Sequence, residues 1–227
     1  MKGETMRHLG IAVIAAAFLS ACGLALAADA PAAPAACEAN GFVSIFNGKD
    51  LTGWDGDPKL WSVVDGAIRG QTTKENPAKG NTFLVWKGGQ PKNFVLKIKW
   101  RYQNGNSGIQ YRSKLLPAKA GTPNQWVMSG YQMEVRELGG KDHNRYKIGG
   151  TYMEKSAGGY LTAFGDFNLI ENANGKPKRV AFGDVCDPGL MDAAKLYHLN
   201  DWNEYELVCM GNYVEEHVNG QIASAYI

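Results

Sequence analysis

The sequence predicts an all-β protein, a sandwich of two antiparallel sheets. Residues 94–102 form a predicted strand in which apolar and polar side chains alternate from Leu96 onward, the period of a strand with one buried face. Turn dipeptides separate several further strand-like segments, and only Leu190 to Leu199 has the character of a short helix. Many strands with Gly-rich turns and little helix favour two packed sheets.

The first 27 residues have the three zones of a secretory signal. Lys2 and Arg7 precede an apolar run, and small residues follow it. Two cleavage sites are possible and exclude each other, because a lipobox ends at Cys22 and a small-x-small pattern ends at Ala27. Both predict export to the periplasm or cell envelope, either with a lipid anchor at Cys22 or as a released protein. The Ala- and Pro-rich residues 28–40 predict a flexible tether.

Residues 41–227 have a length that fits one domain. The sequence holds 24 basic and 22 acidic residues, a near balance that gives no electrostatic reason to expect nucleic acid or an anionic membrane as partner. Outside the leader, no stretch approaches the roughly 20 apolar residues of a membrane-spanning helix. We therefore expect neither a nucleic-acid partner nor a membrane span.

The cysteines and histidines predict no metal site. Cys186 and Cys209 could pair in an oxidising compartment, and the alternative is that Cys209 is a small buried hydrophobe. No Cys or His spacing resembles a zinc site. We expect no cofactor, although a divalent metal in the pocket is left open.

The elements can be placed in order along the chain. Asp65-Gly66 joins strands at 61–64 and 67–69, and Asn219-Gly220 separates Val218 from Gln221 in the same way. Long loops at 113–129 and 160–200 could wall a substrate pocket. Further strands are expected at residues 82–86, 109–113, 131–138, 150–153, 204–210 and 213–218.

Two of these strands combine an apolar face with a polar face. If they are antiparallel neighbours, strand alternation gathers five polar side chains on one sheet face. An ordinary solvated face with cross-strand ion pairs and a functional site both fit this pattern. The five side chains are Gln110, Arg112, Gln132, Glu134 and Arg136.

Two further segments bear on ligand binding. Asn106 and Ser107 belong to a segment with the composition of a turn. Trp126 lies in a loop with Pro and Gly, and it is the tryptophan expected to be exposed, where it could stack on a sugar ring. The sequence contains no nucleophile elbow, phosphate-binding glycine loop or HExxH helix.

A set of short motifs follows one another over residues 42–221: Phe46–Trp54, Trp61–Gly66, Gly105–Ile109 with Arg112, Gly130–Val135, Gly150–Tyr152, Trp202–Asn203 and Val218–Gly220. In this order they resemble the 3-keto-disaccharide hydrolase family. The resemblance implies a concanavalin A-like, jelly-roll sandwich and an envelope enzyme that cleaves glycosides oxidised to a ketone at carbon 3. Family members continue beyond the position of Ile227 to another core strand, so the resemblance also implies a truncated carboxyl end.

This resemblance implies chemistry with a single base. The 3-keto group acidifies the hydrogen on carbon 2, so the glycosidic oxygen on carbon 1 can leave by elimination before water adds. The implied roles are base for Glu134, donors to the keto or enolate oxygen for Arg112, Asn106 and Ser107, and substrate contacts for Gln110, Gln132, Tyr152 and Trp126.

Two other functions remain alternatives to the enzyme. A lectin-like carbohydrate-binding module would hold a glycan without chemistry, since fold does not dictate function. An envelope scaffold would need neither a polar groove nor exposed aromatic side chains. Glu134 discriminates among them, because a catalyst requires this carboxylate and a binder does not.

Overall fold

The computed structural model describes residues 11–20, 41–103, 105–118, 125–136, 148–156, 158–174, 176–185, 196–198 and 200–227. Nearly all regular structure in these ranges is β, so the predicted all-β class is confirmed. The strands are β1 (Ile11–Ser20), β2 (Val43–Ser44), β3 (Trp54–Asp55), β4 (Trp61–Val64), β5 (Ala67–Gly70), β6 (Val85–Trp86), β7 (Phe94–Gln103), β8 (Asn106–Leu115), β9 (Met128–Arg136), β10 (Ile148–Glu154), β11 (Gly159–Tyr160), β12 (Asp166–Ala173), β13 (Lys176–Asp184), β14 (Asn203–Met210), β15 (Tyr213–Val218) and β16 (Gln221–Tyr226).

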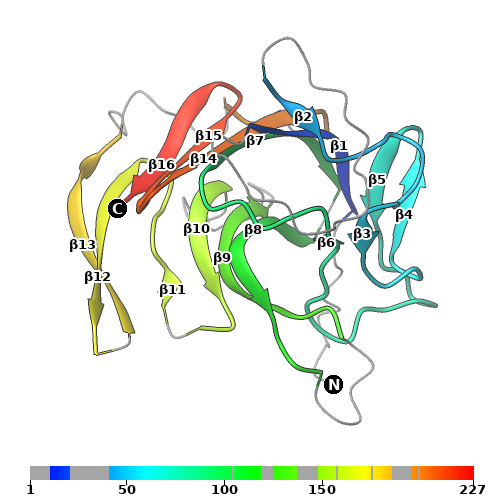
Figure 1. The fold of residues 1–227 in the computed structure, drawn as a ribbon, viewed down its shortest axis with the longest axis horizontal. Helices are drawn as coiled ribbons and strands as arrows, with labels where there is room; N and C mark the ends of the chain where they lie inside the picture. Colours follow the sequence, from blue (N-terminus) through cyan, green and yellow to red (C-terminus); the bar gives the residue numbers. More distant parts are fainter. Residues whose placement is uncertain are drawn as a thin grey trace, which may run out of the picture.

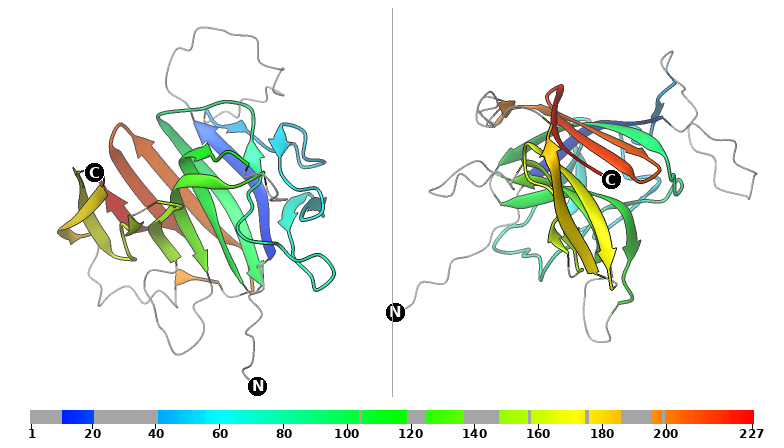
Figure 2. Two further views of the ribbon diagram at one scale, coloured as in Figure 1. Left: turned by 90° about the horizontal axis from the view of Figure 1, so that it is seen from below. Right: turned by 90° about the vertical axis from the view of Figure 1, so that its left-hand side faces the viewer.

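Two sheets form the layers of the sandwich (Figures 1 and 2). The large sheet has the order β13-β12-β16-β15-β14-β7-β1-β5-β4, with β2 paired to β1. The small sheet has the order β11-β10-β9-β8, and its pairings are antiparallel. Strands β3 and β6 form a separate two-stranded ribbon. Strand β8 is thus an edge strand of the small sheet.

The core lies between the inner faces of the two sheets. Along β7, Phe94, Ile98 and Trp100 are buried, whereas Lys97 and Lys99 are exposed on the outer face. The small sheet contributes buried side chains of its own, among them Tyr111, Met133 and Val135. The strand alternation that the sequence predicts is therefore present on both sides of the core.

The two predicted tight hairpins form as expected. Asp65 and Gly66 have φ of 51° and 73°, and Asn219 and Gly220 have φ of 47° and 80°. Two successive positive φ angles match the right-handed twist of the flanking strands, which is why Asp-Gly and Asn-Gly favour such turns.

Some predicted boundaries are wrong. Residues 160–200 are not one long loop, because β12 and β13 form an antiparallel hairpin within them. The strand predicted at 82–86 is reduced to Val85–Trp86, which pairs with β3. The helix predicted at 190–199 lies outside the described residues except for 196–198.

The predicted leader and the cysteines lie only partly within the described residues. Residues 11–20, predicted to belong to a cleaved signal, form β1 between β7 and β5. Cys209 is buried and carries a free thiol, which fits the buried-hydrophobe alternative, and Cys186 lies outside the described residues. Within the described ranges, no helix has the length and apolar character needed to cross a membrane.

Candidate functional site

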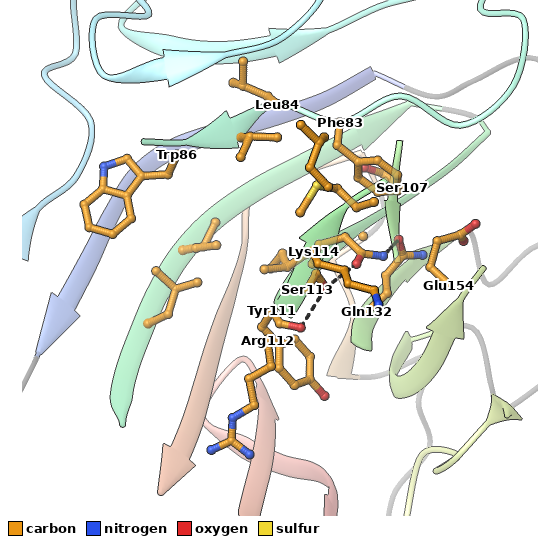
Figure 3. A pocket seen from close by; sticks show the side chains of 18 of the residues that line it. Phe83, Leu84, Trp86, Ser107, Tyr111, Arg112, Ser113, Lys114, Gln132 and Glu154 are labelled. Carbon is orange, nitrogen blue, oxygen red and sulfur yellow. Dashed lines mark hydrogen bonds between the residues drawn. The ribbon is translucent and has the colours of Figure 1, made fainter. Parts of the chain in front are cut away.

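A cavity of about 1890 Å³ lies over β8 and β9, beside the segment 81–93 (Figure 3). It exceeds the roughly 300–1,000 Å³ typical of small-molecule sites, so it can hold more than one ring of a ligand. Leu84 and Trp86 lie on one side of it, and Gln132 and Glu154 lie on the other.

The polar face of β9 is buried within this cavity. Glu134 is 2% exposed and Gln132 is 6% exposed, and both line the cavity. The paired strands put Gly108 opposite Glu134 and Gln110 opposite Gln132. An ordinary solvated face does not describe Gln132 and Glu134, because both side chains are buried. A buried carboxylate usually has a specific role or partner.

A chain of hydrogen bonds connects these side chains. Gln132 Nε2 donates to Glu134 Oε1 at 2.7 Å, and Gln110 Nε2 donates to Gln132 Oε1 at 3.0 Å. Ser113 Oγ donates to Gln110 Oε1 at 2.6 Å. Gln110 and Gln132 are thus bonded to each other, and both line the cavity, where their predicted contacts with substrate stay a prediction.

The backbone around Glu134 is fixed from the core side. Tyr205, on β14 of the large sheet, donates its hydroxyl to the main-chain carbonyl of Glu134 at 2.9 Å. On the cavity side, a Cβ at Gly108 would overlap the side chain of Gln132. The absence of a side chain at position 108 therefore leaves the space through which Gln132 reaches Glu134.

Arg112 lines the cavity, but its side chain does not lie beside that of Gln110 as the predicted alternation requires. It has a φ of 47°, and the β8–β9 register shifts between Tyr111 and Lys114. This β-bulge turns the Arg112 guanidinium toward the main-chain carbonyls of Gly211, at 2.6 Å, and Lys92, at 3.4 Å. In Figure 3 the side chain points away from Gln132.

The other predicted ligand contacts are divided between the cavity and its surroundings. Asn106, Ser107 and Tyr152 line the cavity, and Asn106 and Ser107 begin β8 instead of forming a turn. Tyr152 pairs with Gln132 across β9 and β10. Trp126 is not among the lining residues and is only half-exposed, and its indole N–H donates to Asp55 at 2.8 Å.

Sequence reasoning missed many of the lining residues, and four of them bear on the site. Glu154 is 6% exposed and shares the face of Tyr152, two residues earlier on β10, so strand alternation could have found it. Ser113 reaches the cavity only because of the bulge between Tyr111 and Lys114, which no sequence pattern predicts. Tyr160 packs edge-on against Tyr152, with ring centroids 5.0 Å apart, and Trp86 lies on the opposite wall.

Another buried carboxylate lies behind this site. Glu216, on β15, accepts hydrogen bonds from Thr151 Oγ1 at 2.9 Å, Ser224 Oγ at 2.9 Å and Tyr111 Oη at 3.0 Å. Burial raises its pKa to about 7, and the three hydroxyls partly offset that rise. Burial likewise raises the pKa of the Tyr111 phenol.

Among the residues that the structure describes, no group of three or more His, Cys, Asp or Glu side chains is arranged to hold a metal ion.

Comparison with known proteins gives two findings. The profile of 3-keto-alpha-glucoside-1,2-lyase-like domains matches residues 41–227. The chain is also 29% identical over 135 residues to a 3-keto-disaccharide hydrolase of Bacteroides thetaiotaomicron. That similarity covers 54% of this chain and 46% of the relative, so the chain spans about half the relative's length.

Proposed function

Because the chain belongs to the family of 3-keto-alpha-glucoside-1,2-lyase-like domains, we propose that it cleaves 3-keto-glycosides, including 3-keto-disaccharides, with Glu134 as base. One observation carries the proposal: a buried carboxylate lines a large cavity and is held by an amide donor at 2.7 Å. A general base must be held in one orientation relative to the proton it removes.

The proposed reaction has two steps. Glu134 removes the proton on carbon 2, and the electrons of that C–H bond form an enolate whose charge lies on the carbon 3 oxygen. The enolate then re-forms the ketone, its electrons make the C1–C2 double bond, and the C1–O bond breaks. The leaving oxygen takes a proton and departs as an alcohol, leaving an enone. Water then adds to carbon 1 and a proton returns to carbon 2, so the net result is hydrolysis.

The developing enolate oxygen needs donors on the same face as Glu134. Asn106 is two positions from Gly108, which pairs with Glu134, and so it shares that face. Tyr152, opposite Gln132, presents a phenol to the same cavity. We assign these two residues to the enolate and ring oxygens ahead of Arg112, whose guanidinium bonds two main-chain carbonyls.

The position of Glu154 favours one base over two flanking carboxylates. Glu154 pairs with Gly130, four residues from Glu134 along β9. At about 3.3 Å per residue, the two backbone positions are roughly 13 Å apart. The carboxyl groups of ordinary glycosidases are about 5–9.5 Å apart, so from these backbone positions the two side chains would have to lean toward each other to flank one bond.

Solvent labelling tests this mechanism. In D₂O, elimination followed by hydration places a deuteron on carbon 2 of the released 3-keto-sugar, adding about one mass unit that is measurable by mass spectrometry. Direct displacement at carbon 1 leaves carbon 2 unlabelled. A parallel incubation of the 3-keto-sugar alone corrects for spontaneous enolisation, and release of unlabelled sugar would contradict the elimination.

The binding module gives a different result in the same assay. It would bind the 3-keto-glycoside without releasing either product. Export to the cell envelope, by lipid anchor or as a released protein, is part of our proposal and is supported by the signal-like leader.

A further inference from the structure

We infer that Ser113 is a positioning residue for Glu134, acting through Gln110 and Gln132. This inference rests on the proposed function, in which Glu134 is the base. Ser113 Oγ, Gln110, Gln132 and Glu134 are connected by hydrogen bonds of 2.6, 3.0 and 2.7 Å.

The proposed role of Glu134 fixes the direction of these hydrogen bonds, because a general base acts in its ionised form. A carboxylate only accepts hydrogen bonds, so Gln132 must turn its Nε2 toward Glu134 and its Oε1 toward Gln110. Gln110 must then donate to Gln132 and present its own Oε1 to Ser113. The last group in this series of hydrogen bonds must therefore donate to Gln110 Oε1, and the Ser113 hydroxyl is that donor.

The local backbone brings Ser113 to this position. The positive φ of Arg112 shifts the alternation of β8 by one residue, so Ser113 joins Gln110 on the cavity face. A Cβ at Gly130 would overlap the Ser113 side chain, so the absence of a side chain on β9 provides its space. The Ser113 hydroxyl also lies 2.8 Å from the carbonyl of Tyr111 and 3.4 Å from that of Tyr131.

Loss of the Ser113 hydroxyl should affect the chemical step more than substrate binding. Without that donor, the orientation of both amides is less restricted, and Gln132 holds Glu134 in its productive rotamer for less of the time. Losing one neutral hydrogen bond predicts a fall in kcat of about threefold to tenfold. KM should change less than about twofold, because Ser113 acts on the base and not on the substrate.

Kinetics of matched variants test the inference. Ser113→Ala should lower kcat and move the acidic limb of the pH–rate profile to higher pH, since the ionised base is less well stabilised. Ser113→Thr retains a hydroxyl and should restore most of the rate. Ser129→Ala is the control, because this hydroxyl, on β9, lies outside the cavity lining and approaches the Lys155 carbonyl at 3.4 Å.

A second readout does not depend on turnover. The side-chain amide signals of Gln110 and Gln132 in NMR spectra should shift and exchange faster in Ser113→Ala than in the unmutated protein. Unchanged amide signals, or changed signals with unchanged kcat and pH profile, would overturn the inference. If the unmutated protein cleaves no 3-keto-glycoside, the proposed function fails. The amide signals still decide whether the hydrogen bonds from Ser113 through Gln110 and Gln132 to Glu134 form.

Discussion

Buried carboxylates have two different surroundings in this protein. Glu134 lines the cavity and accepts from an amide, whereas Glu216 lies between the sheets and accepts from three hydroxyls. Hydroxyl donors stabilise a buried carboxylate only in part, so the pKa of Glu216 remains raised to about 7. Its titration should therefore be visible in the stability of the protein.

We predict that Glu216 makes the fold less stable as pH rises from about 4.5 to about 7. In this window the folded state holds a proton that the unfolded state has released, so the free energy of unfolding falls with increasing pH. The decrease should be on the order of 3 kcal/mol and should level off above pH 7.

Urea denaturation between pH 4.5 and pH 8 measures this effect against Glu216→Gln. The variant keeps the volume and the polar partners but cannot titrate, so the difference between the two proteins isolates Glu216. A difference that is the same at every pH would contradict the assignment.

The sequence predicts the faces of side chains correctly along β9 but not at Arg112 and Ser113 on β8. Alternation correctly separates Gln132 and Glu134 from Met133 and Val135, because β9 is regular there. It fails one strand away, because a bulge at a non-glycine residue leaves no signal in the sequence.

At the scale of elements, hairpins with strong turn dipeptides could be predicted. Residues 61–70 and 213–226 form as expected, and β8 and β9 are antiparallel neighbours with Gln110 opposite Gln132. The β12–β13 hairpin was missed although Asn174-Gly175 lies between its strands and Asn174 has a φ of 55°. Exposed polar residues along β13 hide the alternation, because an edge strand lacks a fully buried face.

The short β6 has a different explanation. A strand was predicted over 82–86 from its β-branched and aromatic residues, but only Val85–Trp86 has a partner, in β3. Strand propensity describes fit to a pleated surface and cannot supply a neighbouring strand. Residues 82–84 line the cavity instead.

In the whole molecule, residues 11–20 have two roles that exclude each other: part of a cleaved leader, and a strand of the large sheet. Strand β1 pairs with β7 from Ile11 opposite Gln103 to Ser20 opposite Val95, and it also pairs with β5. Signal cleavage, at either site, would remove this strand and leave both neighbours without the partner between them.

We predict that the exported protein begins at Cys22 with a lipid adduct or at Ala28 without one. The intact mass of the protein from an envelope fraction distinguishes the two starts. Recovery of an unprocessed chain beginning at Met1 from that fraction would contradict export with cleavage.

Processing should also lower thermal stability. If removal of β1 lowers the free energy of unfolding by about 2 kcal/mol, the Tm should fall by about 4–8 °C for a domain of this size. Thermal unfolding of the chain from Met1, compared with the chain from Ala28, measures this difference. Equal Tm values would mean that β1 contributes nothing to the sheet.

Turnover by Glu134→Gln shows whether Glu134 is the base of a 3-keto-glycoside-cleaving enzyme. The variant keeps the volume of the buried side chain and removes the basic oxygen. With a 3-keto-disaccharide as substrate, kcat should fall by about 10²- to 10⁴-fold while Tm stays unchanged. Glu206→Gln, which alters a partly exposed carboxylate paired with Lys97 at 3.2 Å, should retain full turnover. If the Glu134→Gln protein keeps the kcat and the Tm of the unmutated protein, Glu134 is not the base.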